Sequence, residues 1–205
     1  MIPSETMKIL DVWNKNIFGE FSISEIMRRT GKKTKPWIFN GLKKLSNANL
    51  IIQRRKGNIN LYMLDVRNPM LIQTLQFMEA QKTYNFPRLD VIRKMIDRIP
   101  VKCYCIIVFG SYAEGKKTKD SDLDICFLIE SESDGKKIKP HFNDIKLSSS
   151  VDIDDHYITF GDFIKMLLRE EENLGKQIFR NHKIFFCADI YYKLIVEAYK
   201  NGFRP

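Results

Sequence analysis

The sequence predicts an α+β protein in two parts, a small helical unit that ends in a hairpin and a larger unit built on a sheet. Three observations support this class. Helical periodicity fills the first third of the chain and gives way to a short hairpin pattern. Two apolar runs typical of strands follow within residues 101–129, separated by a polar stretch. Almost all of the excess positive charge lies in the first third.

Length and composition set the outer limits. The chain has 205 residues, of which 44% are hydrophobic and 29% charged, as is usual for a globular protein with one large or two small domains. No apolar run approaches the roughly 20 residues that span a bilayer. The start, "MIPSETMKIL", lacks the order of a signal peptide. We therefore expect a cytoplasmic protein without membrane partners.

The charge is unevenly distributed. Residues 1–68 hold 13 Lys and Arg against 5 Asp and Glu, a net +8, whereas the whole chain carries +9. This asymmetry favours a nucleic-acid-binding N-terminal module joined to a nearly neutral body.

The four cysteines fit a reducing compartment. Cys103 and Cys105 are two residues apart and would share one face of a strand, but no second pair at metal-ligand spacing accompanies them. We interpret them as buried, reduced thiols.

Three helical patterns open the chain. Residues three apart form the apolar stripe of the first pattern: Met7, Leu10 and Trp13. The second begins at Ser22, where Glu25 completes the spacing of a capping box, and ends near Gly31. The third begins after Thr34, a candidate N-cap, with Pro36 in its first turn. Its core positions and its end are Ile38, Leu42, Leu45 and Asn49.

Next, "LIIQRRKGNINLYML" reads as two short strands around Gly57-Asn58. Three helices and a hairpin over residues 5–65 resemble the winged helix-turn-helix family. The resemblance implies that the third helix enters the major groove of duplex DNA while the hairpin touches the backbone. The candidate DNA-binding residues are Lys32, Lys33, Lys35, Lys43, Lys44, Arg54, Arg55 and Lys56. Winged helices also bind proteins, and the sequence leaves that alternative open.

Residues 67–100 form a predicted helical connector. One apolar stripe follows Leu71, Leu75 and Met78, and a second follows Leu89, Ile92 and Ile96. These stripes predict two helices that pack on another element or on a second copy of the chain.

The run "VKCYCIIVFGS" predicts a strand that stops at Gly110-Ser111, and "DLDICFLIE" predicts another. Strict alternation puts Asp122 and Asp124 on one face of the second strand. Like charges this close need a cation, and Mg²⁺ prefers carboxylate and phosphate oxygens. Glycine lets a backbone approach a phosphate, to which the serine hydroxyl and nearby amides can donate. Turn and acids together predict a site for a metal-bound triphosphate.

Gly110-Ser111 followed by Asp122-Leu123-Asp124 resembles the signature of the DNA polymerase β superfamily of nucleotidyltransferases. The fuller pattern "GSYAEG…SDLDI", with Ser121, resembles the minimal nucleotidyltransferases common in archaea and bacteria. The resemblance covers residues 101 to about 160 and, more loosely, the tail "FIKMLL…FRNHKIFF". It implies a mixed sheet and a nucleotide site at Gly110, Ser111 and Ser121. One departure is Glu114, where these proteins often carry a basic residue.

The resemblance also implies a third carboxylate from a neighbouring strand. "SSSVDIDDHYITF" offers Asp152, Asp154 and Asp155. Asp152 has the better apolar flanks, but Asp154 lies nearer the centre of the strand, as the third acid of the family does. We favour Asp154 and keep Asp152 as the alternative metal ligand. His156 is interpreted as a structural strand histidine, and the last 45 residues as helical.

These readings give three segments: a DNA-binding winged helix at 1–66, the connector at 67–100, and a nucleotidyltransferase domain at 101–205. The implied reaction transfers a nucleoside monophosphate from a nucleoside triphosphate, with ATP expected, to an acceptor hydroxyl, using Mg²⁺. The alternative is a DNA-binding regulator whose transferase-like domain only senses nucleotide or binds a partner. A partner protein from an adjacent gene and a homodimer are both expected possibilities.

Overall fold

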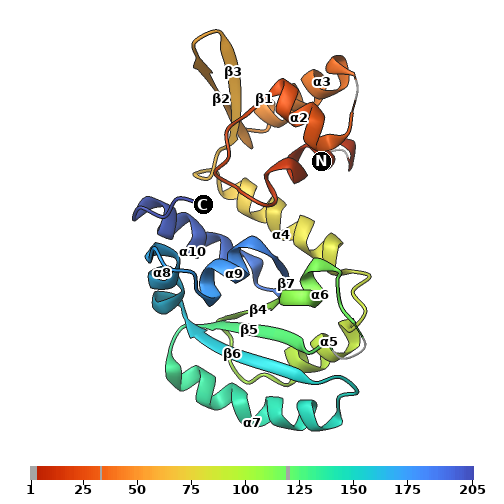
Figure 1. Ribbon diagram of the computed structural model, residues 1–205, viewed down its shortest axis with the longest axis vertical. Coiled ribbons are helices and arrows are strands. Elements are labelled where there is room, and N and C mark those ends of the chain that lie inside the picture. Colours follow the sequence, from red (N-terminus) through yellow and green to blue (C-terminus); the bar gives the residue numbers. More distant parts are fainter. Residues whose placement is uncertain (1–3, 33, 119–120) are drawn as a thin grey trace. The chain divides into compact units, whose positions relative to one another are not determined.

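The computed structural model describes residues 4–32, 34–118 and 121–205 (Figure 1). The chain divides into two compact units, the first ending at Thr74 and the second spanning Leu75–Arg204. Helix α4 (Pro69–Thr83) contains the division. Within the described ranges, no helix has the length and apolar character needed to cross a membrane.

The first unit consists of helices followed by a hairpin, with a small sheet. Its elements are α1 (Ser4–Leu10), the 3-10 helix η1 (Asp11–Trp13), β1 (Phe21–Ser22), α2 (Ile23–Thr30), α3 (Lys35–Asn47), β2 (Ile51–Lys56) and β3 (Ile59–Leu64). The three strands are antiparallel in the order β1-β3-β2. Strand β1 was not predicted, because two residues are too short for a period of two to show.

Local signals fix the helix ends of the first unit. The capping box predicted at Ser22 and Glu25 is present, and Gly31 ends α2 with a left-handed φ of 66°. Thr34 is the N-cap of α3, but its side chain makes no capping hydrogen bond, so that part of the expectation was wrong. Asn49 adopts the predicted left-handed conformation, with φ at 54°. Gly57 does the same at the hairpin turn, where Lys56 pairs with Ile59.

The second unit contains the larger sheet. Its further elements are α5 (Leu89–Arg98), β4 (Tyr104–Phe109), α6 (Gly110–Glu114), β5 (Leu123–Ile129), α7 (Glu132–Ser148), β6 (Ile153–Thr159), α8 (Phe160–Leu168), α9 (Leu174–Arg180), β7 (His182–Phe186) and α10 (Ala188–Lys200). The strand order is β6-β5-β4-β7, with β5 and β6 parallel and the other pairs antiparallel. The α+β content and the mixed sheet expected from the sequence are confirmed.

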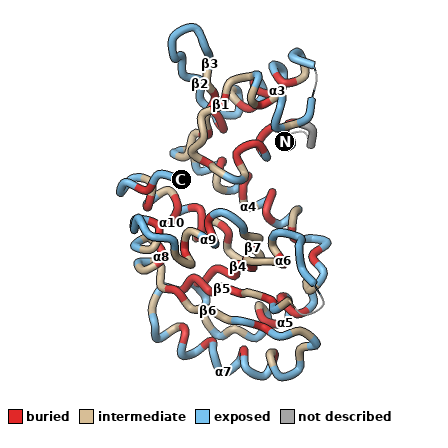
Figure 2. Tube along the Cα trace, in the orientation of Figure 1, coloured by how far each residue is buried: buried red, intermediate tan, exposed pale blue. Residues whose placement is uncertain are grey.

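Helices cover both faces of this sheet, with α5 and α7 on one side and α8, α9 and α10 on the other (Figure 1). Strands β4 and β5 are buried along nearly their whole length (Figure 2). On the α5 and α7 side, Phe127 stacks on Tyr157 at 5.1 Å and meets Phe142 edge-on at 5.2 Å between ring centroids. This packing fixes α7 against the two strands that it connects.

Several expectations about the second unit were wrong. The segment after Phe109 is not a simple turn but begins the short helix α6. The last 45 residues are not all helical, because β7 pairs with β4. The run from Asp162 to Phe179 is two helices, since Asn173 donates to the carbonyl of Met166 at 2.7 Å and caps α9 at Lys176.

Two further differences concern a thiol and a helix. Cys105 is buried as expected, whereas Cys103 precedes β4 and is exposed. Helix α7 was not predicted, although two parallel strands need a long crossover between them.

Candidate functional site

The end of β4 meets the acid-bearing strand at a glycine. Gly110 begins α6 with a left-handed φ of 64°. A Cβ atom placed there would lie 2.1 Å from Oδ2 of Asp124. Glycine is therefore required twice over, by its backbone conformation and by the carboxylate packed against it. The sequence interpretation foresaw a glycine that admits a phosphate, but not one that makes room for the acid itself.

The register between β5 and β6 brings the acids together. Leu123 pairs with Ile153 and Asp124 pairs with Asp154. The backbone N–H of Leu123 donates to the carbonyl of Asp152 at 2.8 Å. Because neighbouring positions in a parallel pair share a face, Asp124 and Asp154 lie at one level of the sheet. Asp122 and Asp152 each lie two residues earlier on their own chain segments.

Asp155, the remaining acid of this run, faces elsewhere. It pairs with Ile125 across the strands and forms an ion pair with Lys146 of α7. Its alternation places it on the core side, so it does not join the other acids.

The candidate site concentrates negative charge around Asp124. Burial raises the pKa of Asp124 first of all, and the carboxylates of Asp154 and Asp122 raise it further, while His156 acts in the opposite direction. His156 Nε2 lies 3.2 Å from Asp154 Oδ2, and its ring lies 5.6 Å from that of Phe109. This histidine is thus part of the acid cluster rather than of the core.

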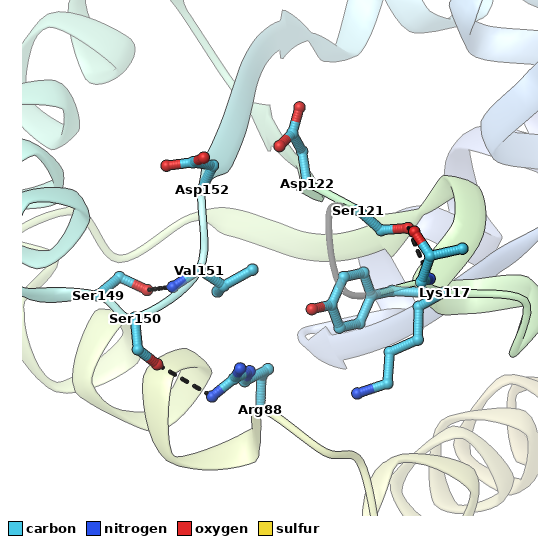
Figure 3. Close-up of a pocket in the computed structure, with 10 residues that line it drawn as sticks. Arg88, Lys117, Ser121, Asp122, Ser149, Ser150, Val151 and Asp152 are labelled. Carbon is cyan, nitrogen blue, oxygen red and sulfur yellow. Dashed lines mark hydrogen bonds between the residues drawn. The ribbon is translucent and has the colours of Figure 1, made fainter.

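A cavity of about 770 Å³ opens beside the acids (Figure 3). Its lining comes from α6 and from the segments before α5, β5 and β6: Arg88, Tyr112, Lys117, Thr118, Ser121, Asp122, Ser149, Ser150, Val151 and Asp152. Ser121 Oγ accepts from the backbone N–H of Thr118 at 2.8 Å, which orders this wall. Gly110 and Ser111 are not among the described lining residues.

Residues 94–191 match the family model "Polymerase beta, Nucleotidyltransferase". The match supports the nucleotidyltransferase superfamily for this part of the chain, and nucleotidyl transfer in general as its chemistry. The matched range includes Gly110, strands β5 and β6, and the acids Asp122, Asp124, Asp152 and Asp154. The first unit lies outside it. Neither the curated proteins nor the solved structures yielded a match to the chain.

Nucleotidyltransferases of this family typically use divalent metals, so the fit of the acids to such an ion matters. Carboxylate oxygens are the donors that hard divalent cations prefer. Among the described residues, however, no three His, Cys, Asp or Glu side chains converge closely enough to hold an ion. The acids fit a divalent cation in their chemistry, and Asp124 and Asp154 are directly paired across the two strands. To enclose an ion, their carboxylates would have to rotate towards one another.

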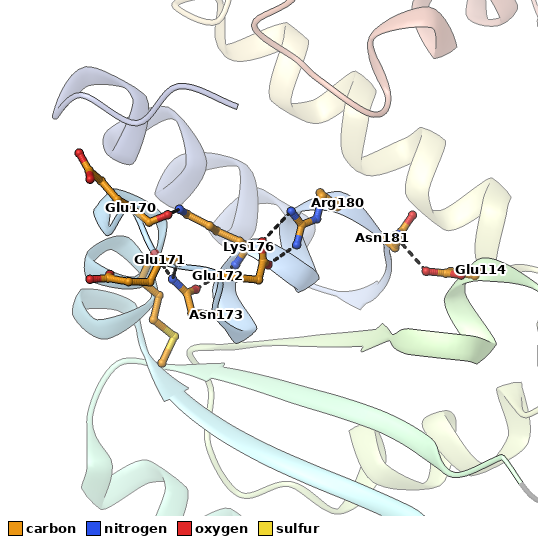
Figure 4. A network of polar contacts seen from close by, with 9 residues as sticks. Glu114, Glu170, Glu171, Glu172, Asn173, Lys176, Arg180 and Asn181 are labelled. Carbon is orange, nitrogen blue, oxygen red and sulfur yellow. Dashed lines mark hydrogen bonds and ion pairs between the residues drawn. The ribbon is translucent and has the colours of Figure 1, made fainter.

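Glu114, the departure from the usual nucleotidyltransferase pattern, is held in place by two partners. Its Oε1 accepts from Nδ2 of Asn181 at 3.0 Å (Figure 4). Its Oε2 lies 3.0 Å from Nζ of Lys116. The acid therefore ties the end of α6 to the segment between α9 and β7. Beyond it, Arg180 forms an ion pair with Glu172.

Sequence reasoning missed two cations of the site. Arg88 precedes α5 in what was read as a connector, and Lys117 lies in the polar stretch before β5. Neither belongs to a motif, and only the folded chain brings Arg88 next to Ser150, to which its Nη1 donates at 3.2 Å. No local signal could have revealed that contact.

Six of the predicted DNA-binding residues lie on α3 and the hairpin of the first unit, and Lys32 precedes α3. Lys35, Lys43 and Lys44 are exposed on α3, and β2 is exposed from Ile52 onward. Lys32 lies over the ring of Trp37 at 5.2 Å. Arg54 lies 3.7 Å from Glu20, and Arg55 Nε donates to the carbonyl of Gly57 at 3.1 Å. Lys56 is exposed, and Lys33 is outside the described residues.

Gly110→Ala should destabilise the protein clearly more than Gly115→Ala. Both glycines have left-handed backbones, with φ of 64° and 71°, so alanine costs about 1–2 kcal/mol at either position. Only at Gly110 does the new methyl group also meet the Asp124 carboxylate, whereas nothing lies within 4 Å at Gly115. Urea denaturation followed by circular dichroism measures both costs. In an Asp124→Ala background the two costs should become similar. Equal costs in the wild-type background would contradict the contact.

Asp124→Asn should stabilise the protein at pH 7 in the absence of divalent cations. The pKa of Asp124 is raised in the folded state, so its charged form disfavours folding at any pH above that pKa. This penalty disappears as the pH falls through the raised pKa towards the ordinary value of 3.8. The difference in melting temperature between variant and wild type should therefore shrink on acidification.

Asp144→Asn, which removes an exposed carboxylate from α7, controls for the loss of one negative charge from a chain of net charge +9. Thermal melts in EDTA at several pH values give the comparison. An Asp124→Asn variant that is less stable than wild type at pH 7 would show that the acid cluster is not under electrostatic stress.

Proposed function

We propose that the second unit is a Mg²⁺-dependent nucleotidyltransferase. It would transfer a nucleoside monophosphate from a nucleoside triphosphate, ATP being the first to test, to an acceptor hydroxyl. The observation that carries the proposal is that Asp124 and Asp154 pair directly across the parallel strands β5 and β6, and that Gly110, which begins α6, packs against Asp124. The family match over residues 94–191 supports the same class of chemistry.

The roles follow from position. Asp122 and Asp124 would hold the cations, and Gly110, Ser111 and Ser121 would receive the phosphates at the junctions around α6 and β5. Bound divalent cations would neutralise the triphosphate and make the acceptor hydroxyl more acidic. The protein would hold the acceptor oxygen and the α-phosphorus in line while its carboxylates accept the released proton.

Asp154 is proposed as the third acid because it is level with Asp124, its carboxylate being part of the charge that Asp124 experiences. Asp152 lies two residues before Asp154 and lines the cavity instead. Since residues two apart on a strand are separated by about 6.5–7 Å, the two cannot take the same coordination position.

The first unit is proposed to be a winged helix that binds duplex DNA. The exposed lysines of α3 and the basic hairpin supply the cationic surface that phosphate binding needs. Residues 1–68 carry nearly all of the net charge, which supports a polyanionic partner for this unit.

A second candidate function is a DNA-binding regulator whose transferase-like unit senses nucleotide or binds a partner protein. One observation favours it: Glu114, which accepts from Asn181, stands where a basic residue is common. Turnover of radiolabelled nucleoside triphosphates, compared with a gel-shift assay for DNA, separates the two functions.

ATP with Mg²⁺ should bind the wild-type protein in calorimetry and should bind Asp122→Ala/Asp124→Ala much more weakly, because both cation-holding acids are lost. Asp154→Asn should abolish transfer, by orders of magnitude, while nucleotide binding stays within a few-fold. Asp152→Asn is the matched control and should be mild in both assays.

The opposite ranking of the two single variants would move the third acid to Asp152. If neither variant affected transfer, or if the double variant bound ATP as well as wild type, the assignment of the site would fail.

DNA binding by the full chain should weaken steeply with salt. Replacing Arg54, Arg55 and Lys56 with alanine should lower the affinity and reduce the log–log salt slope by about 2–3, close to one unit per lost phosphate contact. Arg93, Lys94 and Arg98, exposed on α5 of the second unit, give a matched triple variant with the same loss of charge. Fluorescence anisotropy of labelled duplex DNA measures both. Equal effects of the two triple variants would favour a protein partner for the first unit.

A further inference from the structure

The cavity beside the acids has two chemically different ends. Arg88 and Lys117 supply positive charge at one end, whereas Asp122 and Asp152 lie at the other (Figure 3). We propose that this cavity is the acceptor site and that the acceptor is a phosphate ester carrying a free hydroxyl. The proposal rests on the proposed transferase function and specifies the class of its second substrate.

Among the residues that the structure describes, no carboxylate forms an ion pair with Arg88 or Lys117. Nε of Arg88 is buried and lacks a hydrogen-bond partner within the part of the chain that the structure describes, and Nη1 donates to Ser150. A guanidinium with five donors and so few partners is suited to a phosphate group, which accepts from several of them at once.

Hydroxyl groups complete the cationic end. Thr118 comes from the wall before β5, and Ser149 and Ser150 come from the wall before β6. Lys117 lies over the ring of Tyr112 at 5.0 Å, so its ammonium stays at the cavity wall. Hydroxyl donors on both sides of two cations are typical of a site for phosphate oxygens.

The other end of the cavity leads to the acids on the β6 side. Asp122 and Asp152 line it, whereas Gly110 and Ser111, which are proposed to receive the triphosphate, do not line the cavity. An occupant that places its phosphate on Arg88 and Lys117 therefore approaches the carboxylates from the direction of the cavity, which Gly110 and Ser111 do not line. That is the direction from which an acceptor hydroxyl, rather than the triphosphate, would approach.

The size of the cavity limits the occupant. About 770 Å³ lies within the range of sites for small molecules, and a pentose phosphate or a single nucleotide unit fits it. The shared chemistry is a hydroxyl and a phosphate on one sugar-sized frame, either as a free compound or as the end of a nucleic-acid strand.

The proposed transfer forms one bond to phosphorus and breaks one. The acceptor oxygen forms a bond to the α-phosphorus of the nucleoside triphosphate, and the bond from that phosphorus to the bridging oxygen breaks. Pyrophosphate leaves with the electron pair, and the hydroxyl proton passes through a carboxylate of the acid cluster to solvent. No oxidant, reductant or further reactant is required.

Calorimetry in phosphate-free buffer tests the proposal with ribose 5-phosphate, ribose and a short oligoribonucleotide as probes. Wild type should bind ribose 5-phosphate and not ribose. Arg88→Gln and Lys117→Gln should each weaken that binding at least about tenfold, because a charged hydrogen bond to phosphate is lost. Lys116→Gln is the matched control, since Lys116 is the neighbouring lysine, pairs with Glu114 and does not line the cavity.

The affinity for ATP with Mg²⁺ separates this proposal from the proposed function. Arg88→Gln should leave the affinity for ATP within about twofold, because Arg88 is not part of the proposed triphosphate site at Gly110, Ser111 and Ser121. An equal loss of ATP and ribose 5-phosphate affinity would assign the cavity to the nucleotide and overturn the proposal while the transferase function stands. Wild type that binds no ATP would instead contradict the transferase function.

The oligoribonucleotide distinguishes the two sources of phosphate ester. Tighter binding than ribose 5-phosphate, lost in Arg88→Gln, assigns the site to a strand end, and the reverse preference assigns it to a free compound. Both results support a phosphate-bearing acceptor. If neither probe shows binding that depends on Arg88, the proposal is wrong.

Discussion

The register of the parallel pair β5 and β6 is the constraint on which the candidate site depends. It sets Asp124 level with Asp154 and turns Asp155 towards Lys146 of α7. Because side chains alternate along a strand, a slip of one residue would send the acids of β6 into the core and bring Asp155 to the site. The register is held by apolar side chains on the opposite face, where Phe127 packs between Tyr157 and Phe142. The core of the second unit thus positions charges that lie outside it.

Bringing the acids together on the paired strands also lowers the stability of the folded state. Burial and two neighbouring carboxylates disfavour the charged form of Asp124, and the backbone of Gly110 is left-handed beside it. Each feature is unfavourable alone and is tolerated because the surrounding strands are almost completely buried. Local stress of this kind is typical of sites whose charge is completed by a ligand. The cluster is therefore better explained by binding than by stability.

Sequence reasoning succeeded where the signal was local. The capping box at Ser22, the left-handed Gly31 and the two-residue turn at Gly57 depend on neighbours within a few positions, and all were predictable. The alternation predicted for the strand is of the same local kind, although β5 begins at Leu123, one residue after Asp122. Failures involved partners far apart in the chain. Strand β7 exists because it pairs with β4, and Arg88 meets Ser150 only after folding. Likewise, the level of Asp154 followed from a pairing register that no single strand encodes.

The placement of the aromatic residues has a practical consequence for spectroscopy. Both tryptophans of the chain, Trp13 and Trp37, lie in the first unit. Trp13 is fully buried, while Trp37 is partly exposed on α3 beneath Lys32. Intrinsic tryptophan emission of the unlabelled protein therefore originates wholly in the first unit, with one quenching-resistant and one accessible fluorophore. The second unit contains no tryptophan, so a change in tryptophan emission reports on the first unit.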